Sequence, residues 1–287
     1  MLALIPFMSL HEALGDGSRF DPGQFTRLSL GGQPIGWIGR FLSAALRRWP
    51  DVFAFVPGEI ALLPSTPQAR SDALGAVARA LEGEGLVRGW RNERYTIFSP
   101  LTGVPMFALE RAAVRAFGLT ARSAHLNGYV RGARGLNIWV ARRSESKPID
   151  PGMLDNLVGG GIAEGMDAQR TLEKESAEEA GIPPTLVALA RRAGSVRVTK
   201  TVPEGVQDEI LHTYDLELAP DFRPANHDGE VAEFRLAARE EMIARLAARE
   251  FTVDAGIVAI DFLLRHGCIP ADIGLERQLA ALRAAVG

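Results

Sequence analysis

The sequence predicts an α/β protein: a three-layer α/β/α sandwich with a mixed sheet, preceded by a smaller α+β N-terminal domain. From Ser123 onward, alternating or apolar strand-like segments are separated by helical patterns, so the strands would be flanked by helices on both faces. Before residue 110, short extended segments surround one long amphipathic helix. No low-complexity linker separates the two parts, which are therefore expected to pack tightly. The predicted division is 1–110, 111–270 and a C-terminal helix at 271–287.

The N-terminal domain is expected to combine short strands with helices. Ser71 is predicted to be the N-cap of the long helix, and Gly83 and Gly85 to end it. In chain order, the expected elements are extended segments at 36–41 and 52–63, a helix from 71 to 82, a strand pair or a strand and turn at 86–98, and a short helix at 110–117.

The second domain carries a hairpin signal, because two apolar segments flank the glycine-bearing turn at 131–135. Thr252 is expected to cap a later helix. The predicted strands are 124–130, 136–142, 194–201, 209–218 and 231–236, and the predicted helices after them are 238–248, 253–265 and 273–286. The last helix is expected to cover a surface or to mediate self-association.

An amphipathic helix pattern within the stretch 154–183 carries a cluster of carboxylates. Glu175, Glu178 and Glu179 share one helix face, because each residue turns the helix by about 100°. On composition alone, a solvated surface helix rich in glutamate is the commoner explanation. The alternative is a metal site, since clustered oxygen ligands suit Mg²⁺ or Mn²⁺ and these ions often serve phosphate chemistry. The glycines just before the helix, Gly160 and Gly161 among them, would let the backbone approach phosphates.

This segment closely resembles the signature of the Nudix hydrolases. Gly160 corresponds to the opening glycine, Lys174 stands where arginine is usual, and Glu175, Glu178, Glu179 and Gly181 match. Met166 stands where the first glutamate of the signature is expected. The resemblance implies a metal-dependent diphosphohydrolase in which Glu175, Glu178 and Glu179 hold the metal.

Further motifs resemble the thiamine pyrophosphokinase-related Nudix proteins, which carry an additional N-terminal domain and commonly lack that first glutamate. These motifs are HLNGYV at 125–130, NIWVARRS at 137–144, PGMLDNLVGGGI at 151–162, HTYDLEL at 212–218, DGEVAEFRL at 228–236 and IDFLLRHG at 260–267. The resemblance implies that thiamine diphosphate, or its oxidised derivatives, is cut to the monophosphate and phosphate. ADP-ribose or another nucleoside diphosphate derivative is the alternative substrate. A catalytically silent binding module and a diphosphate isomerase are the other two classes considered.

Other candidate residues lie outside the signature helix. Glu230 and Glu233 are equal candidates for a further catalytic carboxylate, against the alternative that each is an exposed strand residue. Arg142, together with Arg143 and Lys147, is a candidate for neutralising phosphate charge, although each is more often a solvated surface cation.

Two groups of residues are candidates for substrate binding. His125 and Asn127 in the first strand of the second domain are expected to reach the pocket, with a buried structural histidine as the alternative. The N-terminal candidates for recognising a heteroaromatic group by stacking and hydrogen bonds are Trp90, Arg91, Asn92 and Glu93, with Tyr95 beside them. Core packing is the alternative for Trp90 and Tyr95.

Bulk properties are those of a cytoplasmic enzyme with a small-molecule diphosphate as substrate. The chain has 287 residues, 47% hydrophobic content and a formal net charge of -3, which gives no reason to expect a nucleic-acid partner. Cys268 is the only cysteine, so an intramolecular disulfide is excluded. No apolar run reaches the ~18 residues needed to span a bilayer, so no membrane partner is expected. A homodimer is left open.

Overall fold

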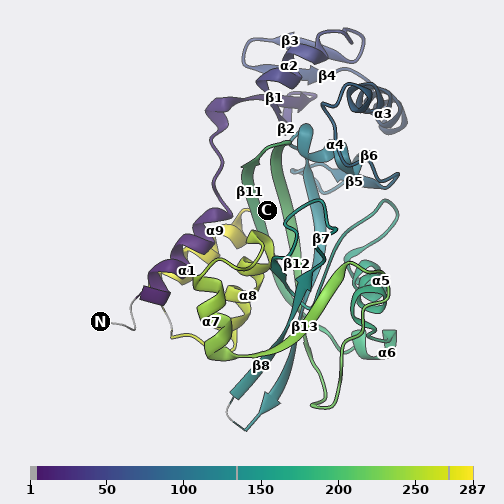
Figure 1. Ribbon diagram of the computed structural model, residues 1–287. Helices are drawn as coiled ribbons and strands as arrows, with labels where there is room; N and C mark the ends of the chain where they lie inside the picture. Colours follow the sequence, from purple (N-terminus) through teal and green to yellow (C-terminus); the bar gives the residue numbers. More distant parts are fainter. Residues whose placement is uncertain (1–4, 134, 271, 287) are drawn as a thin grey trace.

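A computed structural model describes residues 5–133, 135–270 and 272–286. Its centre is a mixed seven-stranded sheet in the order β11-β12-β7-β8-β13, with β10 paired to β7 and β9 paired to β8 (Figure 1). Its strands are β7 (Thr120–Gly132), β8 (Gly135–Arg143), β9 (Leu154–Asp155), β10 (Val158–Gly161), β11 (Arg191–Val202), β12 (Gly205–Glu217) and β13 (Val231–Ala238). β7 and β8 form the expected hairpin, and β12 runs parallel to β7.

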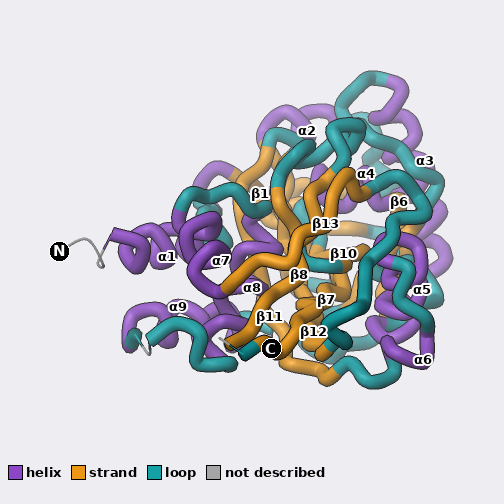
Figure 2. The backbone as a smooth tube through the Cα atoms, turned by 60° about the horizontal axis from the view of Figure 1, so that its bottom comes forward, coloured by secondary structure: helices purple, strands orange, loops and turns teal. Residues whose placement is uncertain are grey.

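Helices cover both faces of this sheet, as Figure 2 shows. One face carries α5 (Ala168–Ala180) and α6 (Pro184–Val187), and the other carries α1 (Ile5–Asp16), α7 (Arg239–Ala247), α8 (Val253–Arg265) and α9 (Ile273–Ala284). Successive residues of β8 pack against the helices on opposite faces of the sheet, because side chains alternate along a strand. Ile138 packs in the core with Phe262, whereas Trp139 packs in the core with Leu172. The predicted three-layer α/β/α architecture is confirmed, and we call this part the sandwich.

A smaller α+β unit, residues 22–121, precedes the sandwich in the chain, and we call it the N-terminal unit. It contains a four-stranded sheet in the order β2-β1-β4-β3 and a separate β5-β6 pair. Its elements are η1 (Pro22–Gln24), β1 (Phe25–Leu30), β2 (Gln33–Gly39), α2 (Arg40–Leu46), β3 (Phe53–Val56), β4 (Glu59–Leu62), α3 (Pro67–Gly83), β5 (Arg94–Phe98), β6 (Pro105–Glu110) and α4 (Arg111–Ala116). Its hydrophobic core runs from Leu28 to Ala121 and includes Phe117 and Leu119. The packing therefore divides the chain near residue 121, beyond the expected 110.

The helix α1 packs with the sandwich, although its sequence lies within the predicted N-terminal domain. Leu10 and Leu14 are 0% and 1% exposed and belong to the core formed with α7, α8 and α9. Full burial of a leucine stabilises a fold by about 1.5–3 kcal/mol. His11 adds a polar contact, since its Nδ1 lies 2.9 Å from Oε1 of Gln278 on α9.

One local expectation in the N-terminal unit is wrong. The helix α3 begins earlier than expected, with Thr66 as its N-cap and Pro67 in its first turn. Proline is tolerated there because a backbone N–H at this position has no partner within the helix. Ser71 lies inside α3, where its hydroxyl donates to Pro67 O (3.0 Å) and accepts from Ala108 N (2.9 Å). The segment 86–98 contains bends at 86–87 and 92 followed by one strand, β5, so the strand-and-turn alternative describes it, and the partner of β5 is β6.

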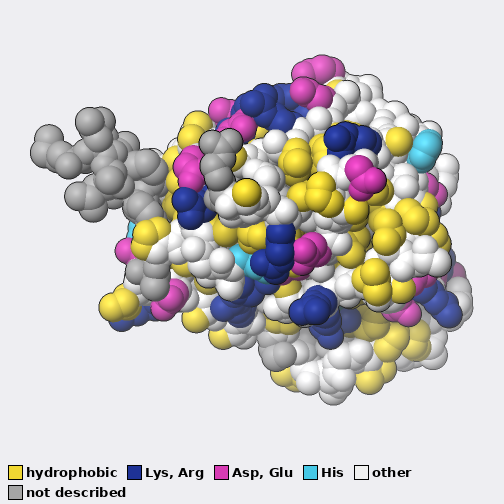
Figure 3. All heavy atoms as spheres, turned by 90° about the horizontal axis from the view of Figure 1, so that it is seen from below, with side chains coloured by type: hydrophobic (Ala, Val, Ile, Leu, Met, Phe, Trp, Pro, Cys, Tyr) yellow, Lys and Arg dark blue, Asp and Glu magenta, His cyan; other side chains and the backbone are white. Residues whose placement is uncertain are grey.

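The surface seen from below is of mixed character. Figure 3 shows hydrophobic, basic and acidic side chains interspersed on this face rather than gathered by sign. Among the described residues, no helix has the length and apolar character needed to cross a membrane.

Candidate active site

The glycines before the signature helix lie in the extended strand β10, which pairs antiparallel with β7, and side chains crowd them on both sides. A Cβ atom at Gly160 would lie 2.3 Å from Cγ of Glu175, and a Cβ atom at Gly161 would lie 1.8 Å from the Tyr95 hydroxyl oxygen. Any larger residue would push these side chains away, so glycine is required here by the close approach of its neighbours. Both glycines line a cavity, as expected for a surface that meets the substrate.

The helix α5 lies beside this strand and has the C-terminal end predicted from the sequence. Asp167 caps its N-terminus by accepting from Arg170 N at 2.8 Å, and Gly181 ends it with a φ of 63°. Glu179 on α5 is 7% exposed, and its Oε2 accepts a hydrogen bond from Gly159 N at 3.0 Å. This hydrogen bond fixes the glutamate helix directly to the glycine-rich strand β10.

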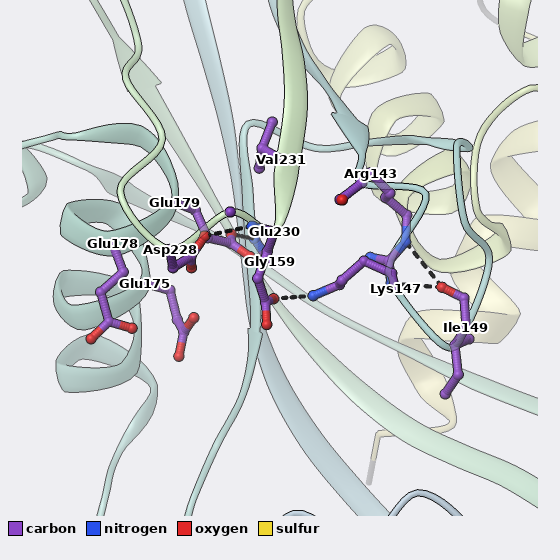
Figure 4. A network of polar contacts seen from close by, with 12 residues as sticks. Arg143, Lys147, Ile149, Gly159, Glu175, Glu178, Glu179, Asp228, Glu230 and Val231 are labelled. Carbon is purple, nitrogen blue, oxygen red and sulfur yellow. Dashed lines mark hydrogen bonds and ion pairs between the residues drawn. The ribbon is translucent and has the colours of Figure 1, made fainter.

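A loop from another part of the chain completes a carboxylate cluster beside α5. Its amides satisfy carbonyls at the end of the helix: Ala225 N donates to Ala180 O (3.1 Å) and His227 N donates to Glu178 O (2.9 Å). The next residues, Asp228 and Glu230, then meet Glu179, so that one carboxylate oxygen of each lies within 4.8 Å of the others (Figure 4). The sequence analysis missed Asp228, for which the only signal was its position two residues before Glu230.

Of the two equal candidates for the further carboxylate, Glu230 lies at the cluster and Glu233 does not. Glu230 forms an ion pair with Lys147. Glu233 follows an irregularity at the start of β13, its side chain is 61% exposed, and its nearest cation is Arg142 at 3.7 Å. The exposed-strand alternative is therefore the one that describes Glu233.

The electrostatics of this cluster favour a bound cation. Burial raises the pKa of Glu179 well above its usual value, and nearby carboxylates raise it further. Burial also raises the pKa of Glu175, although Lys174 opposes the shift. Burial would raise the pKa of Glu230 too, but the ion pair with Lys147 outweighs burial and lowers it. Carboxylate oxygens held this close suit a hard divalent cation, so the residues fit Mg²⁺ or Mn²⁺.

Glu175 and Glu178 lie on the same side of α5, next to the cluster in Figure 4. Lys174 Nζ lies 2.9 Å from Glu175 Oε1 and 2.8 Å from Glu178 Oε2. The cation that replaces the usual arginine of the signature therefore neutralises both glutamates.

A cavity of about 580 Å³ lies between the N-terminal unit and the sandwich, next to the carboxylate cluster. It is large enough for a small organic ligand. The N-terminal unit contributes Arg88, Arg91, Tyr95, Arg111 and Arg115 among others, and the sandwich contributes His125, Arg143, Lys147, Gly159, Gly160, Gly161, Glu209, Glu230 and Asp254 among others. Among the predicted binding residues, Arg91, His125, Gly160 and Gly161 line this cavity.

Three predicted N-terminal residues lie outside the lining. Trp90 packs under the guanidinium of Arg79, 3.7 Å from the ring centroid, and its Nε1 donates to Asn92 Oδ1 at 2.9 Å. Glu93 forms an ion pair with Arg111. Trp90, Asn92 and Glu93 therefore stabilise the N-terminal unit, and the core-packing alternative describes Trp90. Tyr95, which the sequence places beside these candidates, lines the cavity, and so does Arg111, which was not predicted.

Asn127 also lies outside the lining, because it forms part of a buried polar chain. It is 1% exposed, accepts from Asn156 Nδ2 at 3.1 Å and donates to Asp215 Oδ1 at 3.1 Å. His125 is held at the cavity by the same chain, since its Nδ1 lies 3.0 Å from Asn156 Oδ1. Asn127 therefore positions other residues and does not face the ligand space.

Arg143, rather than Arg142, faces the cavity, because neighbouring residues on a strand point to opposite faces. Arg143 donates to Asp155 Oδ2 at 2.8 Å and to Ile149 O at 2.9 Å, which fixes the loop that carries Lys147. Arg142 donates to Gly152 O at 2.7 Å, away from the cavity.

The sandwich fold and the glutamate helix packed on the glycine-rich strand β10 are features of hydrolases of the pyrophosphatase type. Residues 124–257 match the family model described as NUDIX domain, and residues 7–121 match one described as a domain of unknown function, DUF4743. The chain is 34% identical over 259 residues to Nudix hydrolase 20, chloroplastic, of Arabidopsis thaliana, covering 86% of this chain and 69% of that protein. It is 35% identical over 266 residues to Nudix hydrolase 24, chloroplastic, of the same plant, covering 90% and 73%. This chain belongs to the Nudix hydrolase family, whose members act on diphosphate-containing substrates and generally use divalent metal ions.

Among solved structures, the chain is similar to DR0079 from Deinococcus radiodurans at 21% identity, with a TM-score of 0.45, covering 59% of this chain and 98% of that one.

Proposed function

We propose that this Nudix hydrolase cleaves thiamine diphosphate or its oxidised derivatives to the monophosphate and inorganic phosphate, with Mg²⁺ or Mn²⁺ as cofactor. The observation that carries the catalytic part is the cluster of Glu179, Asp228 and Glu230, which lies beside a cavity closed by the N-terminal unit. The resemblance to the thiamine pyrophosphokinase-related subgroup supports the choice of substrate.

The residues proposed to hold the metal come from two segments. Glu175, Glu178 and Glu179 are contributed by α5, and Asp228 and Glu230 by the loop before β13. A bound divalent ion would supply neutralisation of phosphate charge and a lower pKa for a bound water. Three carboxylates this close would repel one another without a cation, which supports this assignment.

The chain's own residues would orient the substrate. Gly159 N–H holds Glu179 in place, and the two glycines after it let the Glu175 side chain and the Tyr95 hydroxyl lie against the strand. Arg143 and Lys147 add positive charge along the same side of the cavity. The organic half of the substrate would then contact the wall from the N-terminal unit, where Arg91 and Arg111 lie.

The test is a substrate panel with Mg²⁺ or Mn²⁺ that contains thiamine diphosphate, its oxidised forms, ADP-ribose and dinucleotides, with products followed by ³¹P NMR. We expect the thiamine compounds to have the highest kcat/KM. Glu178→Gln should be inactive, and Glu233→Gln, which changes an exposed carboxylate outside the cluster, should be active. Preference for ADP-ribose would contradict the proposed substrate. A product with an intact diphosphate would indicate an isomerase, and complete inactivity a silent binding module.

The cytoplasmic location and the homodimer also stay predictions from the sequence. Cell fractionation tests the first, and size-exclusion chromatography with light scattering tests the second.

A further inference from the structure

Tyr95 belongs to the N-terminal unit, but its side chain reaches the glycine-rich strand β10 of the sandwich. The strand that carries it is joined to the segment after β10: Glu164 N donates to Arg94 O at 2.7 Å, and Tyr95 forms a β-bridge with Ala163. Two side-chain bonds of 2.7 Å between Arg94 and Glu164 reinforce this junction. The position of Tyr95 relative to β10 is therefore fixed by both backbone and side-chain contacts.

The hydroxyl of Tyr95 occupies the space that a side chain at residue 161 would fill. A Cβ atom at Gly161 would lie 1.8 Å from this oxygen, so the strand accommodates the hydroxyl only because residue 161 is glycine. In the same way, a Cβ atom at Gly160 would lie 2.3 Å from Cγ of Glu175. The hydroxyl and the side chain of one of the proposed metal-binding glutamates therefore lie against adjacent residues of β10.

Tyr95 is only 7% exposed, and no hydrogen bond joins its hydroxyl to another described residue. The hydroxyl oxygen is not among the fully buried side-chain atoms without a partner, so it is accessible from the cavity, where a tyrosine hydroxyl normally finds a partner. Tyr95 lines the cavity, so a ligand in the cavity is within reach of this donor. Tyr129 differs, because its hydroxyl donates to Glu217.

The surroundings select the kind of ligand group that Tyr95 would meet. Burial raises the pKa of the Tyr95 hydroxyl, so it carries its proton at neutral pH and acts as a donor. The guanidinium of Arg111 lies 5.4 Å from the ring centroid, and Lys147 and Arg143 line the same cavity. Glu175 and Glu209 also act on the hydroxyl, so the space beside the β10 glycines holds charges of both signs. A protonated hydroxyl that lies beside Arg111 and next to the proposed metal-binding glutamates fits an oxygen that accepts from a donor and also binds a metal ion, and a phosphate oxygen is such an acceptor.

We propose that the Tyr95 hydroxyl donates a hydrogen bond to the diphosphate of the substrate, so that the N-terminal unit supplies a residue to the phosphate site. This inference rests on the proposed function for the presence of a diphosphate. It assigns the N-terminal unit a direct part in holding the phosphates, beyond contact with the organic half of the substrate.

The test is Tyr95→Phe, which removes only the hydroxyl, with Tyr214→Phe as the matched control. Tyr214 is also buried, at 6% exposure, but packs in the α5 core away from the cavity lining. A hydrogen bond to a charged group corresponds to roughly a 10- to 100-fold change in affinity. We expect Tyr95→Phe to lower kcat/KM for the best substrate of the panel by at least about tenfold, with an unchanged melting temperature. Tyr214→Phe should retain kcat/KM within about twofold.

A second readout uses methylenediphosphonate, a diphosphate analogue without an organic half, and measures its dissociation constant by calorimetry with Mg²⁺. Weaker binding by Tyr95→Phe, together with unchanged binding by Tyr214→Phe, supports the contact with phosphate. Equal binding by Tyr95→Phe and the wild type overturns it, even if kcat/KM falls, because the hydroxyl would then contact the organic half. If the wild type hydrolyses no compound of the panel, the proposed function fails, and the binding comparison still decides the role of Tyr95.

Discussion

Replacing Glu179 by glutamine tests the carboxylate cluster directly, because the change removes one charge and keeps the volume. The glutamine side-chain oxygen can still accept the hydrogen bond that Gly159 N donates at 3.0 Å. Asp228 and Glu230 are the carboxylates whose oxygens lie within 4.8 Å. Glu179→Gln therefore changes electrostatics at the cluster with little change in packing.

The structure gives opposite expectations for stability and for activity. Two unit charges 4.8 Å apart repel by about 3.5 kcal/mol at an effective dielectric constant of about 20. The free energy of unfolding should rise by less than this amount when one charge is removed, because Lys147 neutralises Glu230, Asp228 is exposed and the pKa of Glu179 is raised. We therefore expect metal-free Glu179→Gln to be more stable than the wild type by about 1 kcal/mol. Loss of a metal ligand should lower turnover roughly a thousandfold, which corresponds to ~4 kcal/mol in the activation barrier.

Thermal unfolding with and without Mn²⁺, together with turnover on the best substrate, separates these effects. Metal should raise the melting temperature of the wild type by mass action and should raise that of Glu179→Gln much less. Glu233→Gln is the control and should behave as the wild type. Full turnover by Glu179→Gln, or an undiminished rise of its melting temperature with Mn²⁺, would refute the assignment of the metal site.

Three further predictions concern positions outside the cluster. Trp90→Ala should destabilise the chain by about 2 kcal/mol in urea unfolding while leaving KM within twofold, because Trp90 packs on Arg79 and lies outside the cavity lining; a large rise in KM without loss of stability would contradict this. Burial lowers the pKa of His212 from 6.5 to about 4. Between these two pH values His212 is protonated in the unfolded chain but neutral in the folded chain, so protonation favours unfolding. Stability should therefore fall across this window, by about 1 kcal/mol at pH 5 after allowance for partial exposure, and His212→Gln should remove that part of the pH dependence. Met166→Glu should change turnover less than about threefold, because the fold holds this turn through a backbone bond from Met166 N to Ala163 O (3.0 Å); a hundredfold change would assign the side chain a role in catalysis.

Features with a local physical signal could be predicted from the sequence. The helix α8 begins after Thr252 as expected, because a threonine N-cap followed by an amphipathic pattern needs no distant partner. The hairpin of β7 and β8 and the Gly181 end of α5 were predictable for the same reason. These signals were enough for the fold class and for the position of the glutamate helix.

The remaining features depend on contacts between distant segments. Asp228 reaches Glu179 only because its loop docks on the end of α5, and no periodicity encodes that docking. Trp90 and Tyr95 are both aromatic residues of one segment, yet one packs on an arginine of its own unit and the other reaches Gly161. Sequence reasoning found the right segment, but the choice between its members depended on tertiary packing.

The position of α1 has a consequence for the order in which the chain folds. On the ribosome, α1 is made before the N-terminal unit, but its partners α7, α8 and α9 are made last. The N-terminal unit has a hydrophobic core of its own, so it can fold before α1 meets the helices α7, α8 and α9. Docking of α1 on these helices closes a loop that contains most of the chain, which costs conformational entropy, and such non-local contacts form slowly. The docking of α1 should therefore be a late step of folding. Pulse-labelled hydrogen exchange during refolding should show the amides of α1 protected after those of the N-terminal unit.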